Sequence, residues 1–227
     1  MSVSRREQNR QAKAGRILDA ALQVFADQGY DGASMDAIAR EAGVSKPTLY
    51  QYFGNKQALF TAMLETEREG MLAPLSQVEG RDTVAVLHAF AWRYAKAVLR
   101  PDMLSLARLI IGEAARQPGI GALFQSVGPD TVRAGLVDYL QAQRDVGALV
   151  FDDAELAAED LWGLILSAPR TQALYRPEVR LSERALARYI HNGLRVFLTA
   201  YAREPEHALT TLKGLIAAGP VRRRPAS

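Results

Sequence analysis

The sequence contains no cysteine among its 227 residues. Such a chain forms no disulfide and offers no thiolate to a metal, which fits a reducing compartment. It also lacks an apolar segment behind a basic N-terminal head, and no stretch approaches the roughly eighteen uncharged apolar residues that cross a bilayer. We therefore expect neither a secretion signal nor a membrane span, and a cytoplasmic location.

Motifs of catalysis and cofactor binding are also missing. His88, His191 and His207 lie far apart in the sequence, and none belongs to an H-E-x-x-H pair. Neither the G-x-S-x-G turn of hydrolases nor a glycine-rich phosphate loop occurs. The acidic residues between 152 and 160 have the spacing of a solvated helix start. The sequence thus predicts no catalytic residue, no metal site, no cofactor and no enzyme.

What the sequence does contain is a helical pattern. Apolar residues recur with the period of about 3.6 that is typical of helices, and the alternation typical of strands is missing. This pattern predicts an all-α fold. Expected helices include one that ends at Gly29, helices over about residues 56–72, 82–99 and 182–201, and helices that begin at Pro101, Pro129 and Asp152. Residues 74–80 are the one plausible linker.

Residues 34–60, SMDAIAREAGVSKPTLYQYFGNKQALF, carry the most specific signal. Ser34 is a natural N-cap for a first helix, which Gly43 ends by adopting a left-handed backbone. Ser45 caps a second helix, and Pro47 lies in its first turn, where a missing backbone N–H has no intrahelical partner to lose. Two short helices joined by a tight turn that contains glycine form a helix-turn-helix unit.

The side chains of the second helix favour DNA binding. The N-terminal residues of such a helix meet base edges in the major groove. Lys46 suits guanine O6 and N7, and Thr48 offers a hydroxyl and a methyl group. Tyr50 and Tyr52 can reach backbone oxygens, and Lys56 can meet a neighbouring phosphate. The alternative is a buried helical hairpin with solvated lysines and tyrosines.

The stretch TLYQYFGNKQALF, preceded by AIAREAGVSKP and ILDAALQVFADQGYDGAS, resembles the DNA-binding domain of the tetracycline-repressor (TetR) family of transcriptional regulators over roughly residues 14–62. The resemblance implies an N-terminal three-helix DNA-binding domain with a helix-turn-helix, and a larger C-terminal helical domain for ligand binding and dimerisation. Pro47 is a departure, because many members carry glycine there. The DNA contacts that the resemblance implies are Ser34, Lys46, Thr48, Tyr50, Tyr52 and Lys56, and Pro47 is a further candidate contact at the start of the same helix.

We therefore expect four segments. They are a flexible basic arm (1–12), the DNA-binding domain (13–73, with its helix-turn-helix at about 34–53), the ligand-binding and dimerisation domain (74–203), and a short helix with a basic disordered tail (204–227). Five basic residues against Glu7 give the first sixteen residues a net charge of +4. Three arginines, 222–224, give the last six residues +3. Whether the arm or the tail touches DNA stays open, because either can lie along phosphates or stay solvated.

Self-association is expected from two apolar stripes. Their residues are Leu161, Leu164, Ile165 and Ala168 on one helix and Leu186, Ile190, Gly193, Leu194 and Phe197 on the other. Two such hairpins can pair as an isologous four-helix bundle, but the same stripes can equally close the core of a monomer. The resemblance favours a homodimer, which would present two recognition helices to a palindromic operator.

The C-terminal region also supplies a candidate site for a small hydrophobic effector between its helices. The candidate lining residues are Phe90, Trp92, Tyr94, Arg108, Glu113, Phe124, Trp162 and Leu166. Large aromatic residues here are also ordinary core residues, so site and core remain alternatives. The segments VLRPDMLSLARLIIGEAARQP and DDAELAAEDLWGLI resemble a C-terminal subgroup of the same family that is often found in regulators of efflux and lipid-related genes.

Together these features predict a ligand-responsive repressor that binds double-stranded operator DNA as a homodimer and is released by a small hydrophobic effector. The rival prediction is a helical small-molecule-binding protein whose DNA contact is nonspecific or architectural. The operator sequence, the effector and the regulated genes do not follow from the sequence.

Overall fold

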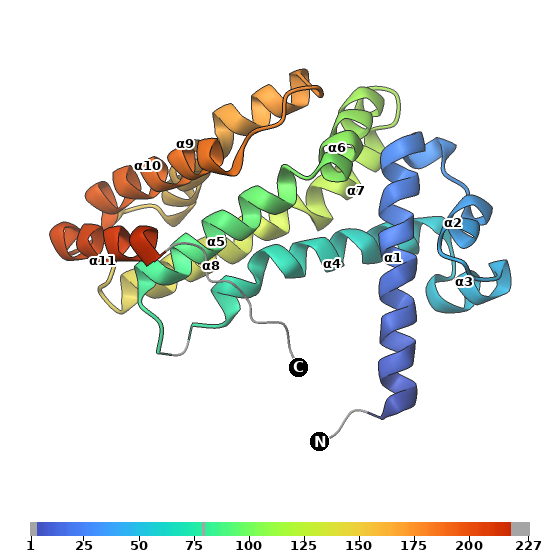
Figure 1. Cartoon of the computed structure of the whole chain (residues 1–227), viewed down its shortest axis with the longest axis horizontal. Coiled ribbons are helices and arrows are strands. Elements are labelled where there is room, and N and C mark those ends of the chain that lie inside the picture. Colours follow the sequence, from blue (N-terminus) through green and yellow to red (C-terminus); the bar gives the residue numbers. More distant parts are fainter. Residues whose placement is uncertain (1–3, 79, 219–227) are drawn as a thin grey trace. The chain divides into compact units, whose positions relative to one another are not determined.

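The computed structural model describes residues 4–78 and 80–218, and this part of the chain is helical almost throughout (Figure 1). Its helices are α1 (Arg5–Gly32), α2 (Met35–Glu41), α3 (Lys46–Phe53), α4 (Lys56–Ser76), α5 (Thr83–Val98), α6 (Pro101–Ala114), α7 (Pro118–Val127), α8 (Pro129–Asp145), α9 (Ala154–Tyr175), α10 (Glu183–Tyr201) and α11 (Pro205–Ala218). The predicted all-α fold is confirmed. In the described residues, no helix is long and apolar enough to cross a membrane.

The chain forms two compact units. The N-terminal unit contains the residues up to Gly70 together with Ala97–Thr131, and the C-terminal unit contains Met71–Lys96 together with the residues from Val132 onward. The N-terminal unit therefore holds α6 and α7 beside the helices of the DNA-binding motif. This division differs from the predicted boundary near residue 73, because α6 packs against α1.

The basic N-terminal segment is not the flexible arm that the sequence analysis expected. From Arg5 onward it is the start of α1, with Ser4 as N-cap accepting a hydrogen bond from the Glu7 N–H at 3.3 Å. The reason is local, since the sequence from Arg5 to Gln11 contains no proline or glycine to interrupt a capped helix. Residues 1–3, and the part of the predicted C-terminal segment 204–227 that follows Ala218, lie outside the described residues.

A cluster of aromatic rings joins the end of α1 to α4 in the N-terminal unit. Gly29 leaves the helical conformation with φ +74°, as its predicted place at the end of a helix requires. The Phe60 ring of α4 then meets Phe25 and Tyr30 edge-on, with centroid distances of 5.0 and 5.1 Å. Phe25 and Phe60 are completely buried. This cluster holds α4 against the end of α1, and α2 packs against α1 in turn.

Two predicted helices have different boundaries in the structure, and a further helix was not predicted. α4 continues through Pro74 to Ser76, because a proline in the last turn removes only one backbone hydrogen bond. α9 likewise passes Pro169, and its N-cap is Asp153, which accepts hydrogen bonds from the Glu155 and Leu156 N–H groups at 2.8 and 3.1 Å. The helix α7 was not predicted, since its two glycines obscure the apolar period.

In the C-terminal unit, α9 and α10 pack closely against one another (Figure 1). A Cβ atom on Gly193 would lie 2.8 Å from the Leu164 carbonyl oxygen and 2.8 Å from Ile165 Cγ2, so only glycine permits this approach. The apolar stripes predicted for dimerisation face this contact, and most of their residues are buried within the monomer. Of the two predicted roles, the structure shows the packing of these stripes within one chain, with Leu164 half-buried and Ala168 exposed, and a part in a dimer stays a prediction.

Gly193→Ala should lower the free energy of unfolding by about 1–3 kcal/mol, because the added methyl group has to displace backbone as well as side-chain atoms. Urea unfolding would measure the change. The control is Gly214→Ala on α11, where a Cβ meets nothing within 4 Å. Alanine there should stabilise the helix by up to about 1 kcal/mol. Equal effects at both positions would contradict the close approach of α9 and α10.

Candidate nucleic-acid interface

Serine caps define both helices of the predicted helix-turn-helix. Ser34 Oγ accepts a hydrogen bond from the Ala37 N–H at 3.1 Å, and Ser45 Oγ accepts one from the Thr48 N–H at 3.3 Å. Gly43 makes the turn between the helices with φ +64°. Leu49 is completely buried and anchors α3 from within. The predicted motif is thus confirmed as a local structure, with Ser34 and Ser45 as the N-caps of its two helices.

The N-terminal end of α3 is exposed. Lys46 and Pro47 are exposed, and the Lys46 ammonium forms an ion pair with Asp36 of α2 at 2.8 Å. The hydrogen bond to Asp36 raises the pKa of Lys46 and keeps it charged. Both side chains remain more than half exposed, and pairs of this kind contribute little to stability. Lys46 can therefore exchange Asp36 for a phosphate or a base at low cost.

The two predicted tyrosines of α3 have different surroundings. Tyr50 is 42% exposed and offers its hydroxyl to solvent. Tyr52 is half-buried and lines a cleft of about 510 Å³ with basic residues of α1. The structure thus places Tyr52 next to basic residues of α1, of which Arg6 and Arg10 lie in the predicted flexible arm.

Lys56, for which the sequence predicts a phosphate contact, is half-buried at the start of α4. Its ammonium donates hydrogen bonds to the carbonyl oxygens of Tyr30, Ala33 and Asp31 at 2.8, 3.1 and 3.4 Å, and it lies 4.6 Å from the centroid of the Tyr30 ring. The last carbonyl groups of a helix lack backbone hydrogen-bond donors, and the Lys56 ammonium group supplies these donors at the end of α1. The structure thus shows a role for Lys56 that was not predicted, since its side chain joins α4 to the end of α1.

Of the predicted effector residues, Phe90, Tyr94 and Trp162 come together in the C-terminal unit. The Phe90 and Tyr94 rings stack at 5.7 Å, and Trp162 lies 5.8 Å from Tyr94. Phe90 and Leu166 are buried core residues. Burial raises the pKa of Tyr94, so its phenol stays neutral. The Trp162 indole N–H is buried without a hydrogen-bond partner, which leaves a donor that a ligand oxygen could satisfy.

Trp92 belongs to a different cluster. Its indole N–H donates to His88 Nε2 at 3.1 Å, and the His88 ring stacks on His191 of α10 with a centroid distance of 5.6 Å. These rings line a pocket of about 250 Å³ together with Glu183, Arg184, Ala187, Leu215 and Ile216. Sequence reasoning missed the histidine pair because it forms only when α5 and α10 pack.

Arg108, Glu113 and Phe124, the other predicted effector residues, belong to the N-terminal unit. Arg108 donates to Ser105 Oγ at 3.0 Å, and Phe124 is half-buried on α7. One Glu113 oxygen lies against Gly29, where a Cβ would approach it to 2.6 Å. The other oxygen is buried without a hydrogen-bond partner. Glu113 thus touches the break in α1.

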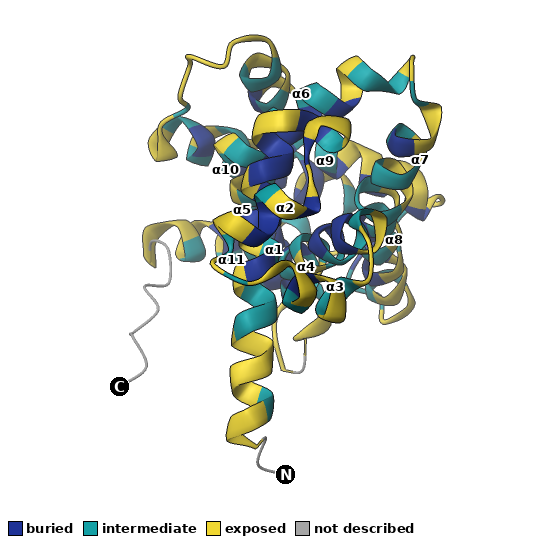
Figure 2. Ribbon diagram, turned by 90° about the vertical axis from the view of Figure 1, so that its right-hand side faces the viewer, coloured by how far each residue is buried: buried dark blue, intermediate teal, exposed yellow. Residues whose placement is uncertain are grey.

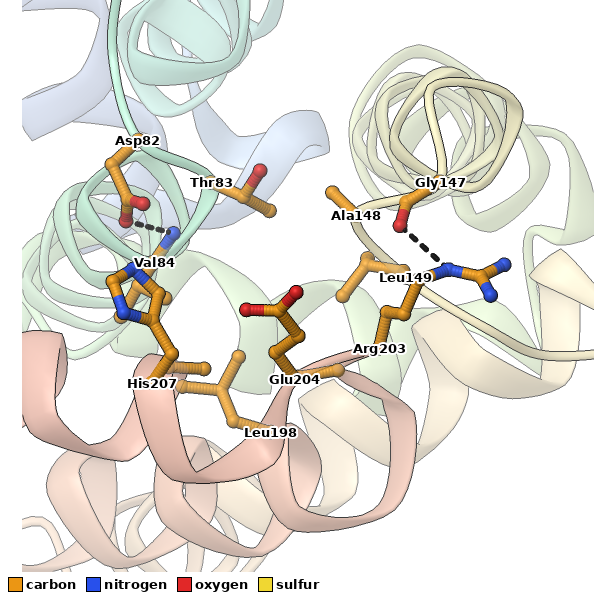
Figure 3. Close-up of a pocket in the computed structure, with 12 residues that line it drawn as sticks. Asp82, Thr83, Val84, Gly147, Ala148, Leu149, Leu198, Arg203, Glu204 and His207 are labelled. Atoms are coloured by element: carbon orange, nitrogen blue, oxygen red, sulfur yellow. Dashed lines mark hydrogen bonds between the residues drawn. The ribbon is translucent and has the colours of Figure 1, made fainter.

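A further cleft of the C-terminal unit, of about 210 Å³, was not predicted (Figure 3). Asp82, Glu204 and His207 line it, and Arg203 Nε donates to the Gly147 carbonyl oxygen at 2.9 Å. Asp82 accepts a hydrogen bond from the Val84 N–H at 2.8 Å and so caps α5. In the described ranges, no group of histidine, aspartate or glutamate residues is arranged to hold a metal ion. The visible role of Asp82 and Arg203 is to secure helix ends.

A capped helix-turn-helix whose second helix has an exposed N-terminal end defines a DNA-binding regulator. Comparison with protein families agrees with this class. Residues 17–63 match the family described as bacterial regulatory proteins of the tetR family, and residues 85–203 match the C-terminal domain of AefR-like transcriptional repressors. The second match spans just over half of the chain. The chain belongs to the TetR family of transcriptional regulators.

Several known regulators resemble the chain. The transcriptional activator FasR of Mycolicibacterium smegmatis is 44% identical over 68 residues, which are 30% of this chain and 31% of FasR, so the match spans about a third of that relative. A TetR-family regulator from Mesorhizobium loti has a TM-score of 0.70 and 29% identity, covering 85% of this chain and 98% of that one. The flavonoid-responsive regulator FrrA has a TM-score of 0.61 and 32% identity, covering 86% and 99%. Like its family, the chain is a transcriptional regulator and not an enzyme.

Lys56→Met should lower the free energy of unfolding by about 1.5–3 kcal/mol, because it leaves the carbonyl groups at the end of α1 without a charged donor. Urea unfolding, with Lys213→Met on the exposed face of α11 as the control, would measure this. The salt dependence of DNA binding should stay unchanged. A salt slope reduced by about one would instead show that Lys56 contacts a phosphate.

The stability of the C-terminal unit should decrease as the pH is lowered, because of His88. Burial, and then the neighbouring His191, lower its pKa from 6.5 to about 4, while Lys96, Glu183 and Arg184 surround the same cluster. An unfolded His88 takes up a proton near pH 6.5 and the folded one does not, so acid favours unfolding between these two values. The wild type should therefore lose more stability than His88→Gln between about pH 7.5 and pH 5. Equal losses in urea unfolding would contradict this account.

Proposed function

We propose that the chain is a homodimeric transcriptional repressor that binds a palindromic operator and is released by a small hydrophobic effector. The main support is the exposed N-terminal end of α3, carried by a capped and anchored helix. A helix in this situation can enter a major groove without rearrangement of its domain. Membership of the TetR family supports the same assignment.

In the proposed complex, Lys46 and Thr48 read base edges, while Ser34, Tyr50 and Tyr52 bind the sugar–phosphate backbone. Lys46 would leave Asp36 on binding. The side chain of Pro47 is exposed at the same end of α3 and can make an apolar contact with a thymine methyl group. Two copies of α3 in a dimer would reach half-sites about 34–36 Å apart, or a multiple of that distance.

The proposed dimer needs exposed surface in addition to the two apolar stripes, since most residues of these stripes are buried within the monomer. The outward face of α9 is a candidate. It exposes Leu156 and Tyr175 to 63% and 82%, and Gly163 and Ser167 lie between them. Small residues on this face would let a partner helix approach closely, and the two large apolar residues would be covered.

The effector is proposed to bind beside Tyr94 and Trp162. The unpartnered indole N–H of Trp162 favours a ligand that carries an acceptor oxygen on an otherwise apolar body. The flavonoid-responsive relative FrrA supports an aromatic ligand with oxygen substituents. Release from DNA requires that this effector bind the DNA-free conformation more tightly than the DNA-bound one.

The alternative function is a helical small-molecule-binding protein that contacts DNA without sequence preference. The basic surface of α1 favours such contact, because neutralised phosphates strengthen binding to any duplex. Selection of duplexes from a random pool, followed by competition of the selected sequence against random duplex, separates the two functions. A ratio of affinities near one would exclude an operator.

Thr48→Ala should reduce discrimination at one position of the selected operator by about 1–3 kcal/mol, or roughly 5- to 150-fold, because the hydroxyl and methyl groups that meet the base are lost. Affinities for the operator and for its single-base variants would be compared by fluorescence anisotropy. Thr66→Ala is the control, since Thr66 lies on α4 and bonds its own helix through the Ala62 carbonyl. Unchanged discrimination in Thr48→Ala would show that α3 does not read bases with this residue.

A further inference from the structure

The first turns of α1 make little contact with the rest of the N-terminal unit. Figure 2 shows this end of α1 as exposed, whereas its middle is buried. The first completely buried side chain is that of Ile17, and from Ser4 to Ala12 no residue is buried. These turns therefore do not contribute to the core, and packing within the unit does not determine their sequence.

Their charge is unfavourable for an isolated helix. Arg6, Arg10 and Lys13 follow one another at spacings of four and three, which places them on one face. Like charges at these spacings destabilise a helix by about 0.2–0.5 kcal/mol for each pair. In residues 4–78 and 80–218, no ion pair involves these three residues or Arg5 and Arg16. The surface thus lacks an anionic partner within the described chain.

The same face lines a cleft that includes the recognition helix. Its residues are Arg6, Asn9, Arg10, Ala12, Lys13 and Arg16 of α1 with Tyr52 of α3. The cleft has a volume of about 510 Å³. Asn9 and Tyr52 add neutral hydrogen-bond donors to four cations, a combination that suits phosphate oxygens. Because Tyr52 belongs to α3, an anion in this cleft lies at the edge of whatever α3 contacts.

We infer that this cleft binds the sugar–phosphate backbone that borders the major groove entered by α3, so that α1 and α3 contact the same duplex. The inference rests on the proposed DNA-binding function. Arg6 and Arg16 are separated by about 15 Å along the helix axis, which matches the rise of roughly four nucleotides of one strand. The helix holds the cations in place before binding, so less conformational entropy is lost than with a flexible arm.

Phosphate contacts strengthen binding without choosing a sequence, and each contact adds about 0.9 to the slope of log K against log salt concentration. The triple variant Arg6→Gln, Arg10→Gln, Arg16→Gln should therefore lower the slope by about 2.7 while leaving the preference for operator over random duplex nearly unchanged. Fluorescence anisotropy with the selected operator between about 50 and 300 mM KCl would measure both quantities.

The matched control removes three charges elsewhere, with Arg116→Gln, Arg176→Gln and Arg180→Gln, all of which are exposed and outside the cleft. Its slope should fall by much less than that of the α1 variant. Similar slopes for both variants would show that only the net charge matters, and would overturn the inference. Circular dichroism of both variants would confirm that the helices are retained.

The importance of the helix is tested by Gln11→Pro, which keeps every charge but interrupts α1 between Arg10 and Lys13. Affinity should fall at least severalfold at low salt if the helix holds the cations in register. Wild-type affinity in this variant would overturn the inference that a helical α1 is needed to hold the cations against the phosphates. If the wild-type chain prefers no duplex over any other, the proposed operator function fails instead. If the wild type is sequence-specific but the triple variant has an unchanged salt slope, only the inference about the cleft is refuted.

Discussion

The arrangement of the DNA-binding helices depends on how α1 ends. At Gly29 the chain leaves the helix, and the ammonium group of Lys56 takes up the carbonyl groups of Tyr30, Asp31 and Ala33 that this end leaves unpaired. The ring of Phe60, one turn further along α4, packs on Tyr30 from the same direction. Because α2 begins at Met35, directly after this junction, the position of the helix-turn-helix follows from it. A hydrogen-bonded cation at a helix end is stronger than an exposed ion pair, so the junction can hold α2 and α3 in place.

From this junction the recognition surface divides into a rigid part and an exchangeable part. Leu49 and the serine caps orient α3, whereas Lys46 is held only by an exposed ion pair with Asp36. The inferred phosphate contact adds the first turns of α1, which are helical and cationic but bury no residue before Ile17. Base reading and phosphate binding would then belong to different helices, α3 and α1, so affinity and sequence preference can change independently.

The C-terminal unit shows how the same residue types serve packing or binding according to their neighbours. The apolar stripes of α9 and α10 meet across Gly193 and form core. Trp92 bonds His88, but the indole N–H of Trp162 on α9 has no partner. An unpaired buried donor costs free energy, and a protein that binds a ligand can recover this cost in the complex. This difference makes Trp162, of the two tryptophans, the better candidate for an effector contact.

The sequence by itself determined the helical class, the caps of α2 and α3, and the family resemblance, because these depend on residues close together in the chain. It also correctly placed helix starts at Pro101 and Pro129. Only the tertiary structure decided the role of Lys56, the burial of the α9 and α10 stripes, and the stacking of His88 on His191. Each depends on which distant segment a side chain meets. Periodicity along one helix shows that a face is apolar or charged, but not whether the same chain, a second copy, a ligand or DNA covers it.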